Sequence, residues 1–397
     1  MWKWIPLITG ILLSLSVKNT SAQVLGLPYF QEQAHVGMNF LYDLDYFKAK
    51  KIFTTLQQKY PQDPAPHFLK ALNTWWRISI SRDFRGYDQE FLTEIDSALY
   101  KCAALEKKPA ARLEYVFLMF NTLAFKGRYY AMREEWFQAA QIARKCVPYL
   151  MEGRKFQDQS VEFDFSIGLY EYFAVYFPEK HPVTRPFMVF FPTGNKIKGI
   201  ALLEKAQAGS SFSRNEALFF LMRIYVDDEP NPSKALVYAK ELVKRYPKNT
   251  VYQVYLAQTL LMNRDIKQAK IILENYQTQF EQLPNYDVRR YDQIHNWLTS
   301  QVMQSVYYYL GKIRLIEEKN VMASIPLFRK AEILSGFCVE LDPIVKEGIW
   351  YYSGRALLAA GKTEAANTYF RKVHKDAETE TFKTAASACL KGNCPTL

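Results

Sequence analysis

Cysteine and histidine are both scarce in this sequence. Its 397 residues include five of each, and the histidines lie far apart, with none sharing a helical turn with a cysteine or another histidine. A His-Glu-x-x-His motif, a glycine-rich phosphate loop and a Gly-x-Ser-x-Gly elbow are also missing. The sequence therefore predicts a protein that is not an enzyme, with no catalytic residues, no metal ligands and no cofactor.

Long apolar runs are missing beyond the N-terminus. A basic start at residues 1–4 precedes an apolar stretch from Ile5 to Val17, and small residues lead to Ala22. This order is typical of a secretory signal peptide, and the stretch is shorter than the ~20 apolar residues that a membrane-spanning helix needs. We expect cleavage between Ala22 and Gln23, with an uncleaved anchor as the alternative. The mature chain would then be exported without a transmembrane segment, and periplasmic if the source is a Gram-negative bacterium.

Runs of charge of one sign are absent as well. The formal net charge is +11, or +9 once Lys3 and Lys18 leave with the signal peptide, but the cations are scattered among acids. Such mixing is typical of a solvated helical surface. The excess of cations slightly favours an acidic partner, either a protein or a peptide. Nucleic acid is not expected as a partner, because export separates the chain from it.

Five cysteines are too few for a disulfide framework in a chain of this length. Cys102, Cys146 and Cys338 lie in or beside apolar helical stretches, where cysteine behaves as a small buried hydrophobe. Cys389 and Cys394 flank a short polar segment at the C-terminus, and an oxidising compartment would allow a local disulfide between them. The bonded and the free form are both open at this stage.

Aromatic residues, in contrast, are plentiful, because 27 Tyr and 27 Phe help to bring the aromatic fraction to 15%. In a helical array such rings fill the space between helices. Alanines recur at positions 201, 235 and 269, and this interval of 34 residues is typical of a repeated helix–turn–helix unit. The unit is most regular between Ser213 and Tyr276, where it is written twice in tandem.

Three further segments carry the same order of small, aromatic and proline positions, in full or in part. They contain Gly37, Phe40, Ala49, Phe53 and Pro61; Leu310, Gly311, Ala323 and Leu327; and Trp350, Ser353, Gly354, Leu357, Ala366 and Phe370. Small residues let two helices approach closely, rings fill the layer between them, and the proline ends the second helix. On these residues the chain resembles the tetratricopeptide repeat superfamily over most of its mature length. The resemblance implies an all-α solenoid of antiparallel helix pairs.

One segment interrupts this pattern. An aromatic helix expected from Val161 to Phe177 is followed by prolines at 178, 182, 186 and 192, which exclude a regular helix. With Gly168 before the prolines and a helix led by Gly199 after them, the segment is similar to the middle of the tetratricopeptide repeat protein 39 family. The similarity implies one irregular, proline-rich insertion in an all-helical fold.

The prolines enclose an apolar run that includes Phe187, Phe190 and Phe191. If the run is exposed, it would contact a partner or a membrane. If it folds back, it covers the aromatic helix before it. The close bracketing by prolines favours the second arrangement.

These patterns divide the chain into five parts. They are a signal peptide at 1–22, N-terminal helix pairs at 23–151, the aromatic helix with its insertion at 152–212, the tandem core at 213–284, and C-terminal pairs with a capping helix at 285–397. A repeat array grows by stacking, so we expect one elongated unit.

The tetratricopeptide resemblance also implies a concave groove lined by the first helix of each pair. Two equivalent helices there carry Tyr308 with Lys312 and Tyr351 with Arg355, each pair one helical turn apart. In two layers, these residues would hold an extended acidic or C-terminal peptide, the cation pairing the carboxylate and the ring covering apolar side chains. The alternative is a tyrosine in the core beside a solvated cation.

We therefore expect a periplasmic scaffold or adaptor that binds a partner segment in this groove. A ligand-binding protein or enzyme with a site in the 152–212 segment, using Glu162, Glu171 or His181, is a second class of function. Glu162 and Asp164 would point to different helix faces, which favours a role at the helix N-terminus over acid–base chemistry. A component of an outer-membrane assembly is a third class. The partner, the pathway and the oligomeric state stay open.

Overall fold

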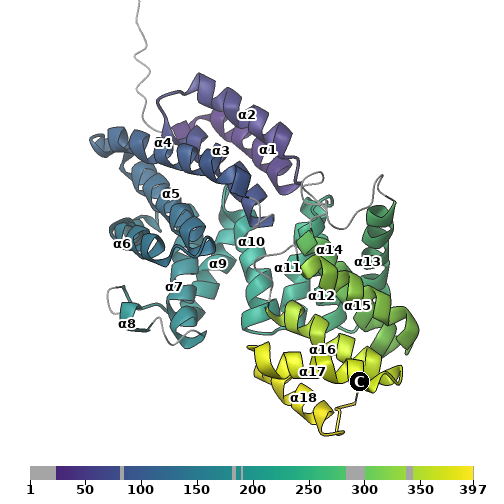
Figure 1. The fold of residues 1–397 in the computed structure, drawn as a ribbon. Helices are drawn as coiled ribbons and strands as arrows, with labels where there is room; N and C mark the ends of the chain where they lie inside the picture. The colour runs from purple at the N-terminus through teal and green to yellow at the C-terminus, as the bar shows by residue number, and fades with distance from the viewer. Residues whose placement is uncertain are drawn as a thin grey trace, which may run out of the picture.

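The structure is a computed structural model that describes residues 24–80, 85–180, 185–188, 191–282, 300–336 and 343–396. Within these ranges all regular elements are helices, and no strand occurs among them. Figure 1 shows the helices stacked into a curved array. The all-α fold predicted from the sequence is confirmed. The predicted signal peptide lies outside the described ranges.

Antiparallel helix pairs build the described part of the array, and we number these layers 1 to 8 in chain order. The pairs are α1 (Pro28–Tyr42) with α2 (Tyr46–Lys59), α3 (Pro64–Ile80) with α4 (Asp88–Glu106), α5 (Arg112–Met132) with α6 (Trp136–Gly153), α7 (Glu162–Lys180) with α9 (Lys196–Gly209), α10 (Arg214–Arg223) with α11 (Pro232–Arg245), α12 (Thr250–Met262) with α13 (Ile266–Glu281), α14 (Ser300–Lys312) with α15 (Val321–Ser335), and α16 (Pro343–Ala359) with α17 (Thr363–Asp376). The last helix, α18 (Glu380–Leu390), packs on α17 and covers the end of the array.

Short helices join these elements. They are η1 (Val24–Gly26), η2 (Arg85–Tyr87), η3 (Pro109–Ala111), η4 (Arg154–Phe156), α8 (Arg185–Met188), η6 (Ile224–Asp228) and η8 (Ile313–Glu317). The last two are π turns at the C-terminal ends of α10 and α14. They add one residue before the turn in layers 5 and 7, so those layers differ in length from the others.

Four layers close the turn between their two helices in the same way. One turn residue adopts a left-handed backbone, and the next N–H donates to the carbonyl five residues earlier. The left-handed residues are Leu44, Glu134, Arg264 and Gly361. The bonds run from Asp45 to Phe40, Glu135 to Tyr130, Asp265 to Leu260 and Lys362 to Leu357, at 2.8–2.9 Å. One turn geometry therefore sets the pairing in layers 1, 3, 6 and 8.

The second helices share a register as well. A small buried residue is the fourth residue of the helix, three positions after its first; these are Ala49, Gly199, Ala235, Ala269, Ser324 and Ala366. Two details of the sequence prediction are wrong. Ala201 is exposed, because Gly199 takes its place against α7, and layer 7 uses Ser324 and Phe328 in place of Ala323 and Leu327.

Glycine on the first helix meets phenylalanine on the second in three layers. A Cβ atom would lie 2.3 Å from the Phe53 ring at Gly37, 2.7 Å from Phe328 at Gly311, and 2.6 Å from Phe370 at Gly354. All three rings are buried, so each one fills the space that the missing side chain leaves. These contacts are the small and aromatic positions of the repeat pattern.

Replacing Gly354 with alanine should therefore destabilise the protein. We expect a loss of about 1–2 kcal/mol in the free energy of unfolding, because overpacking exceeds the gain in helix propensity. Urea denaturation measures the difference. Gly26→Ala is the matched control, because no atom lies within 4 Å of a Cβ there. Equal effects at both positions would contradict the packing role.

The left-handed turns give a second expectation. Gly361 has a φ of 76°, and Gly361→Ala should lose about 1 kcal/mol, because a Cβ crowds the next carbonyl in this conformation. Glu134 has a φ of 60°, and Glu134→Gly should gain roughly 0.5 kcal/mol from the relief of the same strain. Thermal unfolding would show the two shifts with opposite signs. Shifts of the same sign would contradict this interpretation.

The array curves until layers 5 and 6 return to layer 1. The Tyr246 hydroxyl donates to Asn39 Oδ1 at 3.1 Å, and Asn249 Nδ2 donates to the Tyr42 carbonyl at 2.7 Å. These contacts join residues 207 positions apart in the chain. The first helices of layers 1 to 5 consequently face a common interior.

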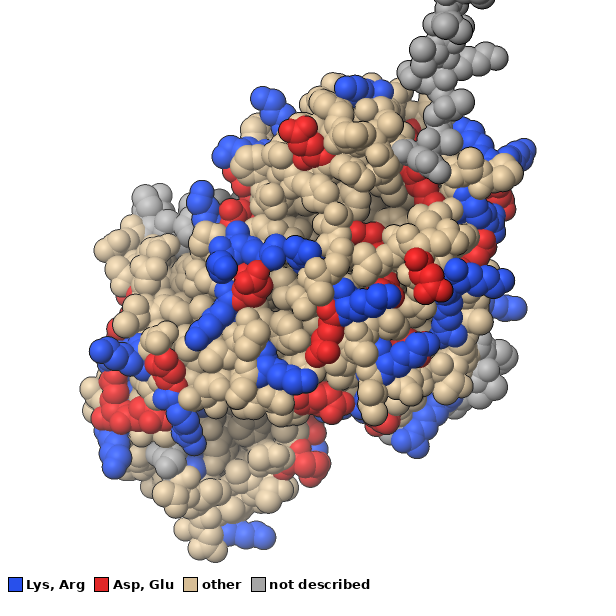
Figure 2. Space-filling model, turned by 180° about the vertical axis from the view of Figure 1, so that it is seen from behind, with Lys and Arg blue, Asp and Glu red and all other residues tan. Residues whose placement is uncertain are grey.

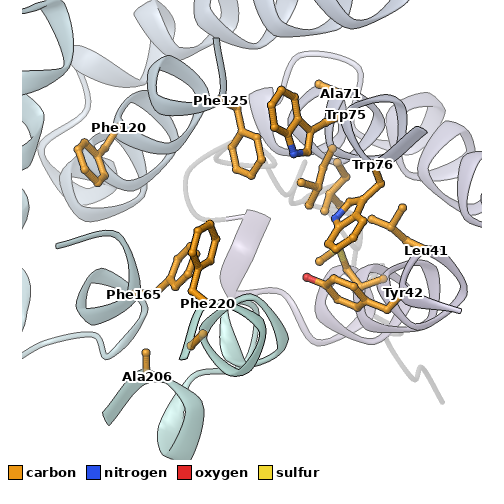
Figure 3. Packing of buried hydrophobic residues seen from close by; sticks show 14 of the residues in the cluster. Leu41, Tyr42, Ala71, Trp75, Trp76, Phe120, Phe125, Phe165, Ala206 and Phe220 are labelled. Carbon is orange, nitrogen blue, oxygen red and sulfur yellow. The ribbon is translucent and has the colours of Figure 1, made fainter. Parts of the chain in front are cut away.

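Aromatic rings fill that interior. Figure 3 shows Trp75 and Phe125 in the neighbourhood of Phe165 and Phe220, with centroids 5.6 Å apart for the first two rings and 6.0 Å for the last two. One buried core runs from layer 1 to Tyr252, so it crosses the predicted divisions at 151 and 212 without a break. The N-terminal half is therefore filled where a concave groove was expected.

The proline-rich insertion lies between α7 and α9. Tyr170 on α7 donates its hydroxyl proton to the Pro192 carbonyl at 2.6 Å, and Phe191 is half-buried. This bond places the end of the insertion against the aromatic helix. Phe190 and the side chain of Phe187 lie outside the described residues.

The C-terminal end is held by a local disulfide and by a ring contact. The structure joins Cys389 to Cys394 by a disulfide. Phe382 on α18 packs against Tyr351 at 5.5 Å between centroids. Cys102 and Cys146 are buried free thiols, as their apolar surroundings predict; Cys338 lies outside the described residues.

Candidate partner-binding face

The acids expected to serve a site in the 152–212 segment have structural partners. Glu162 accepts from the backbone N–H groups of residues 211–213 at 2.6–3.1 Å, which caps the start of α10. Glu171 accepts from Arg154 Nη2 at 3.0 Å and from Lys198 Nζ at 2.8 Å. His181 lies outside the described residues. The carboxylates that were candidates for a ligand site therefore hold helices together.

The interior of the N-terminal half retains a small cavity between the first helices of layers 1 to 5. Its volume is ≈ 50 Å³, and its walls are largely apolar. For comparison, an engineered cavity of about 150 Å³ binds benzene. The buried Glu216 carboxylate at its wall accepts from the Tyr42 hydroxyl at 3.3 Å and from Trp76 Nε1 at 3.2 Å. This cavity is too small for a substrate of ordinary size.

Asp63 is a buried carboxylate at the start of α3. Oδ1 accepts from the Ala65 N–H at 2.9 Å, and Oδ2 has no hydrogen-bond partner among the described residues. Burial raises the pKa of Asp63 to about 6. The folded state therefore holds a proton that the unfolded chain releases at lower pH. The stabilisation from this carboxyl is fully present below about pH 4, the pKa of the unfolded carboxyl, and it is lost as the pH rises through about 6.

Asp63→Asn imitates the protonated carboxyl and keeps the acceptor for Ala65. We expect the variant and the wild type to be equally stable near pH 4. At pH 7.5 the variant should be more stable by roughly 2 kcal/mol, because the wild type has lost its proton. Urea titrations at several pH values measure the difference. A difference that does not change with pH would contradict the raised pKa of Asp63.

The two tyrosines predicted to face a partner are buried between layers. Tyr308 is 3% exposed and Tyr351 is 5% exposed. The Tyr308 hydroxyl lies where a Cβ at Gly348 on α16 would stand, and Tyr351 packs on Phe370 and Phe382. The prediction that these rings cover a partner's side chains is therefore wrong, because consecutive layers close over them.

The cation in each predicted pair has a different environment. Lys312 is half-buried on α14, with Nζ 5.4 Å from the centre of the Tyr308 ring and 5.0 Å from that of Tyr352 on α16. Burial lowers its pKa. Its neighbours Arg314 and Lys330 have acidic partners, Glu274 and Glu318 for the first and Glu281 for the second. No carboxylate pairs with Lys312 among the described residues.

Arg355 is the equivalent residue of layer 8 and is only 7% exposed. Its Nη1 donates to the Tyr351 hydroxyl at 2.7 Å, and the guanidinium lies 5.6 Å from the centre of that ring. Within the described parts of the chain, no acidic side chain pairs with it either. Two successive layers thus each present a desolvated cation that rests on tyrosine.

Sequence reasoning missed two cations in the same register. Gly127 on α5 and Met222 on α10 are equivalent to Gly354 and Gly311, because they lie at the same number of residues before the turn when the extra residue of each π turn is counted. An arginine follows each of them, Arg128 and Arg223. We call the four residues Arg128, Arg223, Lys312 and Arg355 the inner cation row. Both arginines can be found in the sequence, but in layers 5 and 7 the π turn moves the equivalent position by one residue relative to the turn.

The face of the molecule drawn in Figure 2 carries no large patch of charge of one sign. Lys and Arg are interspersed there with Asp and Glu. No helix in the described ranges is long and apolar enough to cross a membrane. Over the same residues, no group of three or more His, Cys, Asp or Glu side chains is placed to hold a metal ion.

Comparison with known proteins assigns the chain to no family. No protein-family model matches the chain, and no curated protein matches its sequence. Among solved structures, the human IFIT1 dimer with PPP-AAAA is similar over 84% of this chain and 69% of its own, at 12% identity and a TM-score of 0.41. The human IFIT1 dimer with m7Gppp-AAAA is similar over 84% and 68%, at 14% identity and a TM-score of 0.31.

The class of protein is therefore defined by its own architecture. It is an all-α, tetratricopeptide-like array of antiparallel helix pairs with a capping helix.

Proposed function

We propose that the protein is an exported, non-catalytic scaffold that binds an acidic segment of a partner protein at layers 7 and 8. The observation that carries the proposal is the pair Lys312 and Arg355, which occupy equivalent positions of two successive layers and have no carboxylate partner within the part of the chain that the structure describes. A carboxylate supplied by a partner would complete both environments through charge-assisted hydrogen bonds.

The energetic argument concerns the unbound state. Removing an ammonium group from water without a counter-ion is unfavourable, and the tyrosine rings under Lys312 return only about 0.5–2 kcal/mol. Three other cations of this region, Lys270, Arg314 and Lys330, avoid this penalty by pairing with acids. A residue that breaks such a local rule is expected at a functional site.

The competing explanation is that Lys312 and Arg355 have only a structural role and stabilise the packing of layer 7 against layer 8. The two explanations differ for Lys312→Met, which keeps the side-chain length and removes the charge. A purely structural role predicts a lower free energy of unfolding for this variant. A binding role predicts equal or higher stability together with weaker partner binding.

We expect Lys312→Met to raise the free energy of unfolding by roughly 1 kcal/mol, because a desolvated charge is removed. A photo-crosslinking amino acid at Ala359, which is exposed one turn beyond Arg355, should yield partner adducts in the native extract. The yield should fall in the Lys312→Met background. The same probe at Met322, 69% exposed on α15, is the control for non-specific capture. Equal yields of adducts from both positions, or a yield that Lys312→Met leaves unchanged, would contradict the proposal.

A ligand-binding or enzymatic site in the 152–212 segment is the weaker alternative. Glu162 and Glu171, the acids that it would use, are engaged by helix N–H groups and by two cations. Export and a periplasmic location belong to the same proposal and rest on the predicted signal peptide alone.

A further inference from the structure

The second helix of a layer turns a fixed register of residues toward the next layer. In α2 the twelfth residue, Gln57, accepts from Lys70 Nζ on α3 at 2.8 Å. In α13 the ninth and sixteenth residues, Glu274 and Glu281, accept from an arginine of η8 at 2.7 Å and from a tyrosine of α14 at 3.0 Å. The fifth, ninth, twelfth and sixteenth residues are three or four positions apart and therefore share one side of the helix. We call this side the stacking face.

The stacking face of α6 is not covered in this way. Its four residues are Ala140, Arg144, Val147 and Met151. Ala140 and Arg144 are exposed, Val147 is half-buried, and Met151 is 43% exposed. Trp136, one turn before Ala140, begins the helix and is 66% exposed. Layer 3 therefore presents to solvent the residues that other layers use for stacking.

The reason is the position of the first helix of layer 4. Its side chains contact α5, where the Phe163 and Phe117 rings lie 5.8 Å apart between centroids and Ser166 Oγ donates to Asn121 Oδ1 at 2.9 Å. At α6 this helix meets the last residue, Gly153, where a Cβ atom would lie 2.9 Å from the Phe163 ring. Figure 1 shows α6 at the outside of the array. In the described part of the chain, residues 136–151 thus lack the helix that covers other second helices.

The consequence is a helix that is apolar on two sides. Ile142, Cys146 and Leu150 are buried in the core of layer 3, while the stacking face continues the apolar surface from Trp136 and from Phe137, which is 76% exposed. A helix with apolar residues on both sides is normally covered on both. Tryptophan, phenylalanine and methionine are also enriched where one protein binds another. The stacking face of α6 therefore has the character of a docking surface.

Charged groups at this surface indicate the chemistry of the occupant. Glu134 and Glu135 are exposed directly before α6, and Arg144 is exposed near its middle. Within the described ranges, none of the three forms an ion pair. A helix that runs antiparallel to α6, as the first helix of a next layer does, ends over the two glutamates and passes Arg144 in its first half. Cations near its C-terminus and acids in its first half complement these charges, and the helix dipole favours the same distribution.

We infer that α6 binds an amphipathic helix of a partner protein in the antiparallel orientation. The partner helix carries acids in its first half, Lys or Arg near its C-terminus, and apolar residues at spacings of three and four. Residues 136–151 span about 24 Å, so the partner helix has about four turns. The surface is separate from Lys312 and Arg355, and the inference therefore goes beyond the proposed function.

Two other occupants fit these charges less well. Arg144 lies near the midpoint of residues 136–151. A second copy that paired its own α6 antiparallel to this one would therefore bring two Arg144 side chains together, and like charges repel. A membrane surface with anionic lipids would meet Glu134 and Glu135, which it would also repel.

Fluorescence anisotropy on the mature protein tests the inference with three labelled peptides of 18 residues. The first has the apolar pattern and charge order of the inferred partner helix. The second has the same apolar pattern with the charge order reversed, and the third is a scrambled form of the first. We expect the first peptide to bind roughly threefold to tenfold more tightly than the second, because exposed charge pairs are weak. The scrambled peptide should bind at least roughly tenfold more weakly than the first, because it presents no apolar side.

Substitutions at exposed positions locate the site without disturbing the core. Ala140→Glu places a charge in the middle of the stacking face, and Trp136→Ser removes its largest ring; each should weaken the first peptide by at least roughly tenfold. The matched controls are Gln141→Glu, exposed outside the register, and Phe47→Ser, 80% exposed at the start of α2. Each control should change the affinity by less than about twofold. Arg144→Glu should reverse the preference between the first two peptides.

Four outcomes would overturn the inference. The first is a designed peptide that binds no better than its scrambled form, which leaves the proposed function at Lys312 unaffected. The second is a loss from Gln141→Glu or Phe47→Ser equal to that from Ala140→Glu, which indicates non-specific binding. The third is a dimer in analytical ultracentrifugation that Ala140→Glu abolishes, which indicates a second copy. The fourth is flotation with phosphatidylglycerol vesicles that Trp136→Ser abolishes, which indicates a membrane surface.

Discussion

The structure depends on the close approach of the two helices within each layer. Where glycine on the first helix faces a phenylalanine ring on the second, as in Gly37 with Phe53 and Gly354 with Phe370, no room for a Cβ remains. Alanine, glycine or serine takes the corresponding position four residues into most second helices. The layers stack in chain order, and the second helix of each layer contacts the first helix of the next.

Curvature turns this stacking into two different halves. In layers 1 to 5 the first helices converge, and aromatic rings with the buried Glu216 fill the space between them. The contacts of Tyr246 and Asn249 with α1 close this half. A surface that would be a groove in a more open array is a filled core in this protein.

Aromatic rings also hold cations of the C-terminal layers in place. Lys312 and Arg355 each lie over one or more aromatic rings, which orient the charge without neutralising it. Where the protein needs only structure, as at Arg314, it pairs cation with acid. This difference distinguishes Lys312 and Arg355 from Arg314 and Lys330, which have acidic partners.

The sequence by itself determined the all-α class, the helix pairing of the first and last layers, and the burial of Cys102 and Cys146, because small and aromatic residues at helical spacing have few alternative arrangements. It missed the register in layers 4 and 7, since Gly199 replaces alanine and a π turn inserts one residue before α15. Only the tertiary structure decided which of the predicted groove residues are buried. Curvature and the next layer bury Tyr308 and Tyr351, and they bring Arg128 over rings from three different helices, which no local pattern encodes.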